Sequence, residues 1–411
     1  MLAGAGSVAA LGRFGAVAAQ PRASIRADFY ANVGAKLLRY RVADDIGSLT
    51  EVGEPLVLPD EVQEAWPRGR FLYVATSDAH TAKEPRNHLL HALAVDSSGT
   101  PKPVGDAVRL RHRPIYITVD RRGEHLLSAF NDPSGVAVHR LNADGSVGAE
   151  VRQVATLDTG IYAHQIRLMP SGRAVVVPAR GNEAVPGREE DRGALKIFGY
   201  EKGQLTNKQS VAPNDGHDFR CRHVEFHASG RFMYVVIEAQ NELHTYRITD
   251  DRLSADPVFV TSTLASSTQS KPGQAASAIR MHPNGRTLYV ANRGRGKETF
   301  RGEEVISEGM ENSIAVLAVN PDTGEPRLIQ SADPRSLDVR MFALHPDGRS
   351  LVATSHESDG PIKRRRGNDI EVVPPRIVLF EIAANGRLRF KYEQDVRTEG
   401  AFMLWCGAVP H

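Results

Sequence analysis

The stretch RHVEFHASGRFMYVVIEAQN, residues 222–241, contains the unit that recurs along the whole chain. The unit is a short apolar strand, a polar turn that usually ends in Gly-Arg, and a second strand of alternating apolar residues. Subtracting the glycine positions (69, 123, 172, 230, 285 and 348) gives steps of 49 to 63 residues, close to the period of about 40–50 residues that is typical of β-propeller blades. The other five copies are PRGRFLYVATSD (67–78), RRGEHLLSAFND (121–132), PSGRAVVVPARG (170–181), PNGRTLYVANRG (283–294) and PDGRSLVATSHE (346–357).

Each copy is followed by a third alternating strand, such as LHTYRI (243–248), and then by a hairpin into a more polar fourth strand. LLRYRV (37–42) is a seventh third strand, so one inner strand is missing from the count. We expect GAFMLWCGAV (400–409) to supply it, because an open array would leave an exposed edge strand. The sequence therefore predicts an all-β chain: residues 26–411 form a single seven-bladed β-propeller of four-stranded antiparallel blades, closed by N- and C-terminal strands.

Residues 1–25 are rich in Ala, Gly and Val, but no basic residue precedes the apolar run and Arg13 interrupts it. We expect a disordered leader, or the remnant of an export signal. The cytoplasm is therefore the favoured location, and the periplasm is the alternative if this segment is a truncated signal. The chain has only two cysteines, Cys221 and Cys406, so a disulfide framework is excluded, although a single bridge is not.

The 411-residue chain carries 51 Lys and Arg against 49 Asp and Glu. This near balance gives no electrostatic signature of a nucleic-acid or membrane partner. The basic run at 363–366 lies in one of three long charged loops (181–193, 294–312 and 358–375), and we interpret it as a solvated loop face. We expect a monomer or a weak homo-oligomer that binds a small molecule.

In a blade, the entry to the first strand and the exit from the second lie on the same face of the ring. Residues at these positions should therefore converge on a cationic well with one carboxylate, Glu238, near its centre. The three long loops leave from this same rim and are candidates for a lid or wall. The entry positions hold Arg113, His164, Arg222, His223, Ser277 and Arg340, and the exit positions hold Asp78, Asn131, Arg180, Glu238, Asn292, Arg293 and His356.

With these residues in place, the sequence resembles the seven-bladed propeller lactonases, which include 6-phosphogluconolactonases and the fungal 3-carboxy-cis,cis-muconate lactonizing enzyme. Residues 222–241 resemble the family's Arg-His … Gly-Arg … Tyr-Val … Glu stretch, and NGRTLYVANRG resembles its Asn-Arg-Gly blade. The resemblance implies a catalytic site at His164, Arg222, Glu238 and Arg293. We predict substrate contacts for a further set of rim residues: Arg180, His223, Asn292, Arg340 and His356. Tyr162 stands where the family has a second His, and Ser277 stands where it has a Glu.

The predicted activity is hydrolysis of a sugar-derived lactone by a water that Glu238 or His164 activates. The lactone is either a plain sugar lactone or one that carries a phosphate or carboxylate. Arg222 and Arg293 would hold the oxyanion or an anionic group. No metal or other cofactor is expected. A muconate-type cycloisomerase, a metal-dependent sugar lactonase and a peptide-binding propeller are the alternatives.

The residues also have a purely structural interpretation, in which Glu238 and Arg222 form an ion pair that braces the blade. The sequence alone predicts that Glu238→Gln and Arg222→Ala each abolish turnover and leave thermal unfolding nearly unchanged.

Overall fold

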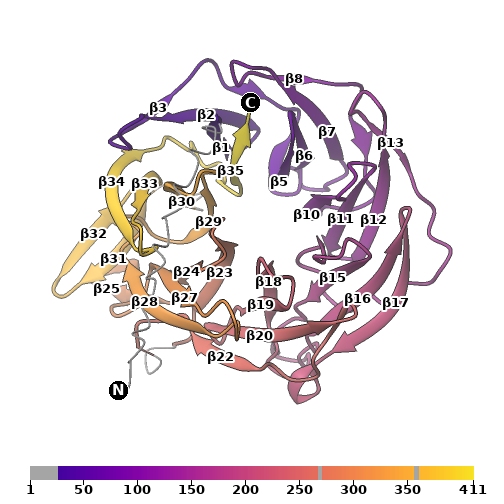
Figure 1. Ribbon diagram of the computed structural model, residues 1–411. Helices are drawn as coiled ribbons and strands as arrows, with labels where there is room; N and C mark the ends of the chain where they lie inside the picture. The colour runs from indigo at the N-terminus through magenta and orange to yellow at the C-terminus, as the bar shows by residue number, and fades with distance from the viewer. Residues whose placement is uncertain (1–25, 267–270, 356–360) are drawn as a thin grey trace, which may run out of the picture.

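The computed structural model describes residues 26–266, 271–355 and 361–411. Seven antiparallel sheets are arranged in a ring around a central channel, and the chain runs once around it (Figure 1). The innermost strand of each sheet lines the channel and the outermost strand lies at the periphery. The predicted seven-bladed propeller is therefore confirmed.

The first four blades contain the strands of the N-terminal half of the chain together with β35 from the C-terminus, and each blade is given from the innermost strand outwards. They are β35 (Cys406–Pro410), β1 (Ala27–Val33), β2 (Lys36–Val42), β3 (Leu49–Glu51) with β4 (Leu56–Val57) also on β2; β5 (Glu61–Arg68), β6 (Phe71–Ser77), β7 (His88–Val95), β8 (Pro101–Pro103) with β9 (Val108–Arg109) also on β7; β10 (Pro114–Val119), β11 (His125–Asn131), β12 (Ser134–Leu141), β13 (Val147–Glu150); and β14 (Arg167–Leu168), β15 (Ala174–Ala179), β16 (Ala194–Glu201), β17 (Gln204–Val211).

The remaining three blades follow the same order. They are β18 (Cys221–Phe226), β19 (Phe232–Ile237), β20 (Glu242–Thr249), β21 (Arg252–Leu253) with β22 (Phe259–Ser262) also on β20; β23 (Gln274–Met281), β24 (Thr287–Gly294), β27 (Ser313–Val319), β28 (Pro326–Ala332); and β29 (Val339–Leu344), β30 (Ser350–Ser355), β33 (Arg376–Ile382), β34 (Leu388–Asp395). A 3-10 turn at Pro213–Gly216 is the one helical element in the described part of the chain.

Hydrogen bonds between blades explain the tyrosine of the repeated unit. Tyr234 donates its hydroxyl to the carbonyl oxygen of Gly324 at 2.9 Å, and Tyr289 does the same to Gly386 at 2.9 Å. Each tyrosine lies on the second strand of one blade, and each glycine lies in the outer hairpin of the next blade. A buried phenol needs a polar partner, so these bonds fix neighbouring blades against one another.

The glycine of the repeat is explained by backbone conformation. Its φ is positive in all six copies, for example 70° at Gly285 and 76° at Gly348. Residues with a Cβ rarely adopt this conformation, so the tight turn between the first two strands of a blade selects glycine.

The ring is closed as predicted, because β35 at the C-terminus pairs antiparallel with β1 at the N-terminus. Asn32, which is fully buried, adds a second connection across this junction. Its Oδ1 accepts hydrogen bonds from the backbone N–H groups of Leu404 (2.9 Å) and Trp405 (2.8 Å), and its Nδ2 donates to the carbonyl oxygen of Phe402 at 3.1 Å. One side chain therefore satisfies backbone groups that β-pairing leaves open.

Replacing Asn32 by Ala is expected to lower the free energy of unfolding by about 2–3 kcal/mol, because two buried N–H groups lose their acceptor. Thermal and urea unfolding of the purified protein measure this change. Asn284→Ala, in an exposed turn where the side chain accepts one hydrogen bond from Arg286, is the control and should cost less than about 1 kcal/mol. Equal losses in the two variants would contradict a closing role for Asn32.

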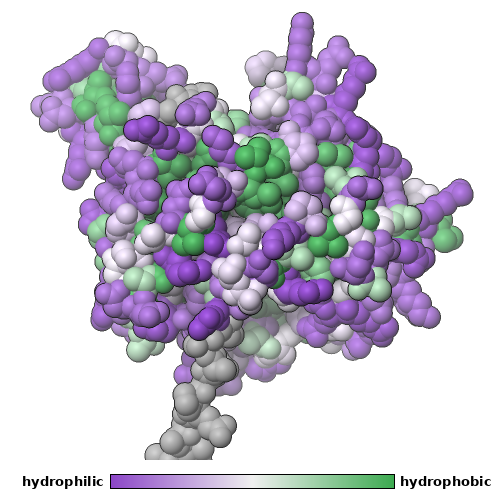
Figure 2. All heavy atoms as spheres, turned by 90° about the horizontal axis from the view of Figure 1, so that it is seen from above, coloured by the Kyte–Doolittle hydropathy of each residue, from purple (hydrophilic) through white to green (hydrophobic). Residues whose placement is uncertain are grey.

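Two of the three long loops form an eighth sheet outside the ring. β25 (Lys297–Phe300) and β26 (Glu303–Ile306) are one hairpin, and β31 (Ile362–Arg366) and β32 (Asp369–Val373) are another. The hairpins join through a parallel pairing of β26 with β31, and we call this four-stranded unit the accessory sheet. In Figure 2, residues at the upper left project from one face of the ring, at the horizontal position of β31 and β32 in Figure 1. The basic run at 363–366 thus lies on a strand.

Both cysteines are free and buried, so the single disulfide that the sequence left open is not formed. The described residues include no helix long and apolar enough to cross a bilayer. The leader, residues 1–25, lies outside the described residues.

Candidate active site

β-Bulges in the innermost strands direct several predicted site residues into the well. The pairing of β18 with β19 shifts register between Cys221 and Val224, and the pairing of β29 with β30 shifts between Val339 and Met341. Arg222, His223 and Arg340 are the residues at these shifts. The prediction that they precede their strands was wrong, because each lies inside a strand. A bulge turns the extra side chain away from the regular alternation, and bulges are frequent next to active sites.

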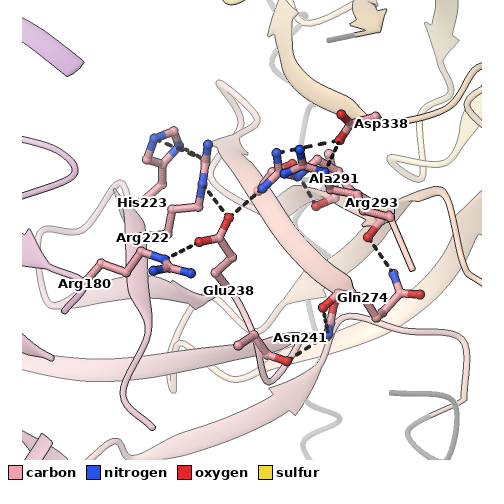
Figure 3. Close-up of polar contacts among 12 residues, drawn as sticks. Arg180, Arg222, His223, Glu238, Asn241, Gln274, Ala291, Arg293 and Asp338 are labelled. Carbon is pink, nitrogen blue, oxygen red and sulfur yellow. Dashed lines mark hydrogen bonds and ion pairs between the residues drawn. The ribbon is translucent and has the colours of Figure 1, made fainter. Parts of the chain in front are cut away.

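Glu238 lies at the centre of three guanidinium groups, as Figure 3 shows. Arg180 Nε donates to Glu238 Oε2 at 2.5 Å, Arg293 Nη2 donates to Oε1 at 2.6 Å, and Arg222 Nε lies 3.3 Å from Oε1. The side chains of Arg222, Arg293 and Glu238 are 2%, 4% and 12% exposed. The structure thus brings together three of the four residues predicted as catalytic, and it adds Arg180 to them.

The electrostatics of this cluster determine what Glu238 can do. Burial alone would raise the pKa of its carboxyl, but Arg222, Arg293 and Arg180 outweigh burial and hold the pKa well below its usual value. A carboxylate with so low a pKa is a weak proton acceptor at neutral pH. Glu238 is therefore suited to orienting the arginines and poorly suited to activating water.

His164 lies beside the cluster, three residues before the start of β14. Its backbone N–H donates to the carbonyl oxygen of Pro178 at 2.8 Å, which fixes the residue to the neighbouring strand. Its ring lies 5.1 Å from that of His223, measured between centroids, and it makes no side-chain hydrogen bond to any described residue. Burial, reinforced by the charge of Arg222, lowers the pKa of His164 well below its usual value. His164 is therefore neutral at pH 7 and has a lone pair available.

Positive charge exceeds negative charge around the well. Arg340 is half-buried and Arg113 is also half-buried, where its Nε donates to Gln63 at 2.8 Å. Burial and the neighbouring Arg293 lower the pKa of Arg340 to about 10, so it remains cationic. The sequence predicted a single central carboxylate, and this was wrong: Asp338 Oδ1 lies 3.7 Å from Arg293 Nη1. Arg340, two residues along the chain, was predicted as a site residue, but nothing in the sequence indicated that the Asp338 carboxylate would also lie beside Arg293.

Three further predicted substrate contacts are Asn292, His356 and His223, and the structure argues against the first of them. Asn292 is fully buried, its Nδ2 donates to Thr263 and Ser313 at 2.8 and 3.0 Å, and its Oδ1 accepts from Thr263 at 2.7 Å. The amide is therefore occupied within the blade, and the geometry does not support a substrate contact. His356 lies outside the described residues. His223 is buried with its ring against Arg222, 3.2 Å from Nη1.

A cleft of about 1240 Å³ opens beside Glu238, and the accessory sheet forms one wall of it. Arg180, Glu238 and Asp338 line the ring side, while Ile306 and Lys363 line the accessory side. The expectation that the long loops form a wall agrees with this arrangement.

Only one group of described residues has the spacing to hold a metal ion, and it lies away from the well. It consists of Asp120, Glu124 and His125. The Asp120 carboxylate already accepts hydrogen bonds from the Tyr200 hydroxyl at 2.9 Å and the Glu124 N–H at 2.8 Å. Metal-independence of the activity remains a prediction.

Comparison with known proteins identifies the family of this chain. The family model "Lactonase, 7-bladed beta-propeller" matches residues 28–363. A 6-phosphogluconolactonase of Bacillus subtilis is 27% identical over 301 residues, covering 71% of this chain and 78% of the relative, and one of Pectobacterium carotovorum is 27% identical over 315 residues, covering 76% and 82%. A periplasmic gluconolactonase structure from Pseudomonas aeruginosa superposes with a TM-score of 0.69 at 19% identity, covering 93% of this chain and 99% of that one, and shows the same fold. The chain belongs to the seven-bladed β-propeller lactonase family.

Proposed function

We propose that the protein is a lactone hydrolase acting on an anionic sugar lactone of the 6-phosphogluconolactone type. The observation that carries this proposal is the neutral, unpartnered His164 beside a buried cluster with more guanidinium groups than carboxylates. Relatives named 6-phosphogluconolactonase at 27% identity support the same substrate class.

In the proposed reaction, His164 takes a proton from water as the water oxygen attacks the lactone carbonyl carbon. The developing oxyanion is stabilised by the guanidinium groups of Arg222 and Arg293, which the protein holds in place before the reaction. As the carbonyl re-forms, the bond to the ring oxygen breaks and that oxygen receives the proton from the His164 imidazolium. The immediate products are a carboxylic acid and a free hydroxyl group, so the proton taken from water is returned within one cycle. The acid then releases its remaining proton to solvent and leaves as a carboxylate.

Glu238 has a positioning role in this scheme. Three long arginine side chains converge on a well only if an anion offsets their repulsion, and Glu238 provides that anion through both carboxylate oxygens. Arg340, half-buried in the bulge of β29, is the residue we assign to the substrate phosphate or carboxylate.

The test is a comparison of kcat/KM for 6-phosphoglucono-δ-lactone, glucono-δ-lactone and a muconolactone. We expect the phosphorylated lactone to be preferred over glucono-δ-lactone by roughly 10- to 100-fold, the value of one or two charge-assisted hydrogen bonds. Arg340→Met should reduce this preference mainly through KM. Arg389→Met, which removes an exposed arginine on the outermost strand β34, is the matched control and should leave the preference intact.

Other outcomes would identify the alternatives. No turnover of either sugar lactone, with activity on the muconolactone, would replace the proposal by a cycloisomerase. No turnover of any lactone would favour a binding propeller. We expect activity to survive a chelator, and its loss would establish a metal requirement. The proposal places the enzyme in the cytoplasm, and an exported location remains the alternative.

A further inference from the structure

The channel has a second cavity at the end opposite the Glu238 cluster, next to the Gly-Arg turns. Its volume is about 310 Å³, at the lower end of the range of about 300–1,000 Å³ seen for small-molecule sites. The innermost strands of all seven blades contribute residues to it, so it lies on the axis of the ring. None of the residues predicted to form the catalytic well lines it.

The walls of this cavity are rich in aromatic rings. Trp66 and Tyr116 meet edge to face with their centroids 6.2 Å apart, and Trp405, which is 2% exposed, also lines the cavity. The guanidinium of Arg167 covers one face of Trp66 at 5.3 Å and is paired with Glu225 at 3.1 Å. Such walls favour a flat apolar group.

A cationic group with little compensation also lines the cavity. Within the described residues Arg280 makes one side-chain hydrogen bond, to the carbonyl oxygen of Ile279 at 2.9 Å, and no ion pair. Besides Glu225, which pairs with Arg167, the lining holds one carboxyl, that of Glu64, which is 4% exposed. Within the described residues its side chain accepts one hydrogen bond, from the Ala65 N–H at 3.3 Å. Burial, only partly opposed by Arg280, raises the pKa of Glu64 to about 7, so Glu64 cancels only part of the Arg280 charge at neutral pH.

We propose that this cavity is a second ligand site, selective for a small aromatic carboxylate. The Arg280 guanidinium binds the carboxylate, and the aromatic ring of the ligand packs among Trp66, Tyr116 and Trp405. The site is distinct from the catalytic well, although the rings of Tyr116 and His223 lie 5.6 Å apart and connect the two.

Tryptophan fluorescence tests the proposal directly, because the chain has two tryptophans and both line this cavity. Titration with phenylacetate should change the fluorescence saturably, with a Kd on the order of 1 mM or tighter for a ligand of this size. Phenylacetamide has nearly the same shape without the charge and should bind about tenfold or more weakly. The readout needs no catalytic activity, so it is independent of the proposed hydrolase function.

Arg280→Met should weaken phenylacetate binding about tenfold or more. Arg286→Met, an exposed arginine of the same blade, is the matched control and should bind as the wild type does. The proposal is overturned if no saturable change occurs, if Arg280→Met binds phenylacetate unchanged, or if the acid and the amide bind equally to the wild type. The comparison of the acid with the amide uses only the wild-type protein, so it tests the proposal even if Arg280→Met does not fold.

Discussion

Replacing Glu238 by Gln is expected to lower the free energy of unfolding by about 3–5 kcal/mol and to remove most of the activity. The substitution keeps the shape of the side chain and removes the negative charge that contacts all three of Arg180, Arg222 and Arg293. Three guanidinium groups then repel one another in a buried site, and breaking a buried ion pair costs about this much. Urea unfolding and steady-state kinetics on 6-phosphoglucono-δ-lactone measure the two effects.

Two further variants test whether the loss of stability and activity comes from removing the buried charge at position 238. Glu183 pairs with the same Arg180 at 3.1 Å but is 62% exposed, so Glu183→Gln should change stability by less than about 1 kcal/mol. Glu238→Asp keeps the charge and should recover part of the stability and turnover. The sequence alone predicted unchanged unfolding for Glu238→Gln. A wild-type unfolding curve would support that prediction and contradict the stabilising role that the structure indicates.

Replacing His164 by Asn is expected to lower kcat by about 10²- to 10⁴-fold, the usual contribution of a general base. The pH dependence gives the specific signature. A base acts in its neutral form, and burial with Arg222 lowers the pKa of His164 below its usual 6.5. The wild-type kcat/KM should therefore be level down to pH 6.5 and fall only as the pH drops through the lowered pKa. This acid limb should be absent from the residual activity of His164→Asn.

His227→Asn is the matched control. His227 is also buried, but it lies in the Gly-Arg turn, where its Nδ1 bonds to Ser229 at 2.7 Å. This variant should keep the wild-type kcat and the acid limb, even if it unfolds more easily. A His164→Asn enzyme with wild-type kcat would show that another group activates the water.

The local pattern of the chain was sufficient to predict the ring. Alternating strands and a turn that demands a positive φ, as at Gly285, specify the same hairpin six times. The missing inner strand followed from counting, which assigned it to residues 400–409, and the strand that completes the first blade is Cys406–Pro410. The same counting placed Glu238 and Arg293 on one rim, because strand direction alone decides which ends meet.

The residues that sequence reasoning missed or misplaced depend on features with no local signature. The bulges that turn Arg222 and Arg340 into the well are set by pairing with the neighbouring strand. Asp338 was not anticipated, because its position beside Arg293 results from the packing of two different blades. The accessory sheet joins loops that are about 60 residues apart in the chain, at the pairing of Ile306 with Arg364.

The order of residues by itself determined the architecture and the chemical character of the rim, because strands, turns and their directions are local properties. Only the tertiary structure decided which of these rim residues are ionised and which are neutral. It made Glu238 an ionised anchor and left His164 neutral, because burial and the distances to neighbouring charges set a pKa. Those distances exist only once separate blades have closed around one axis.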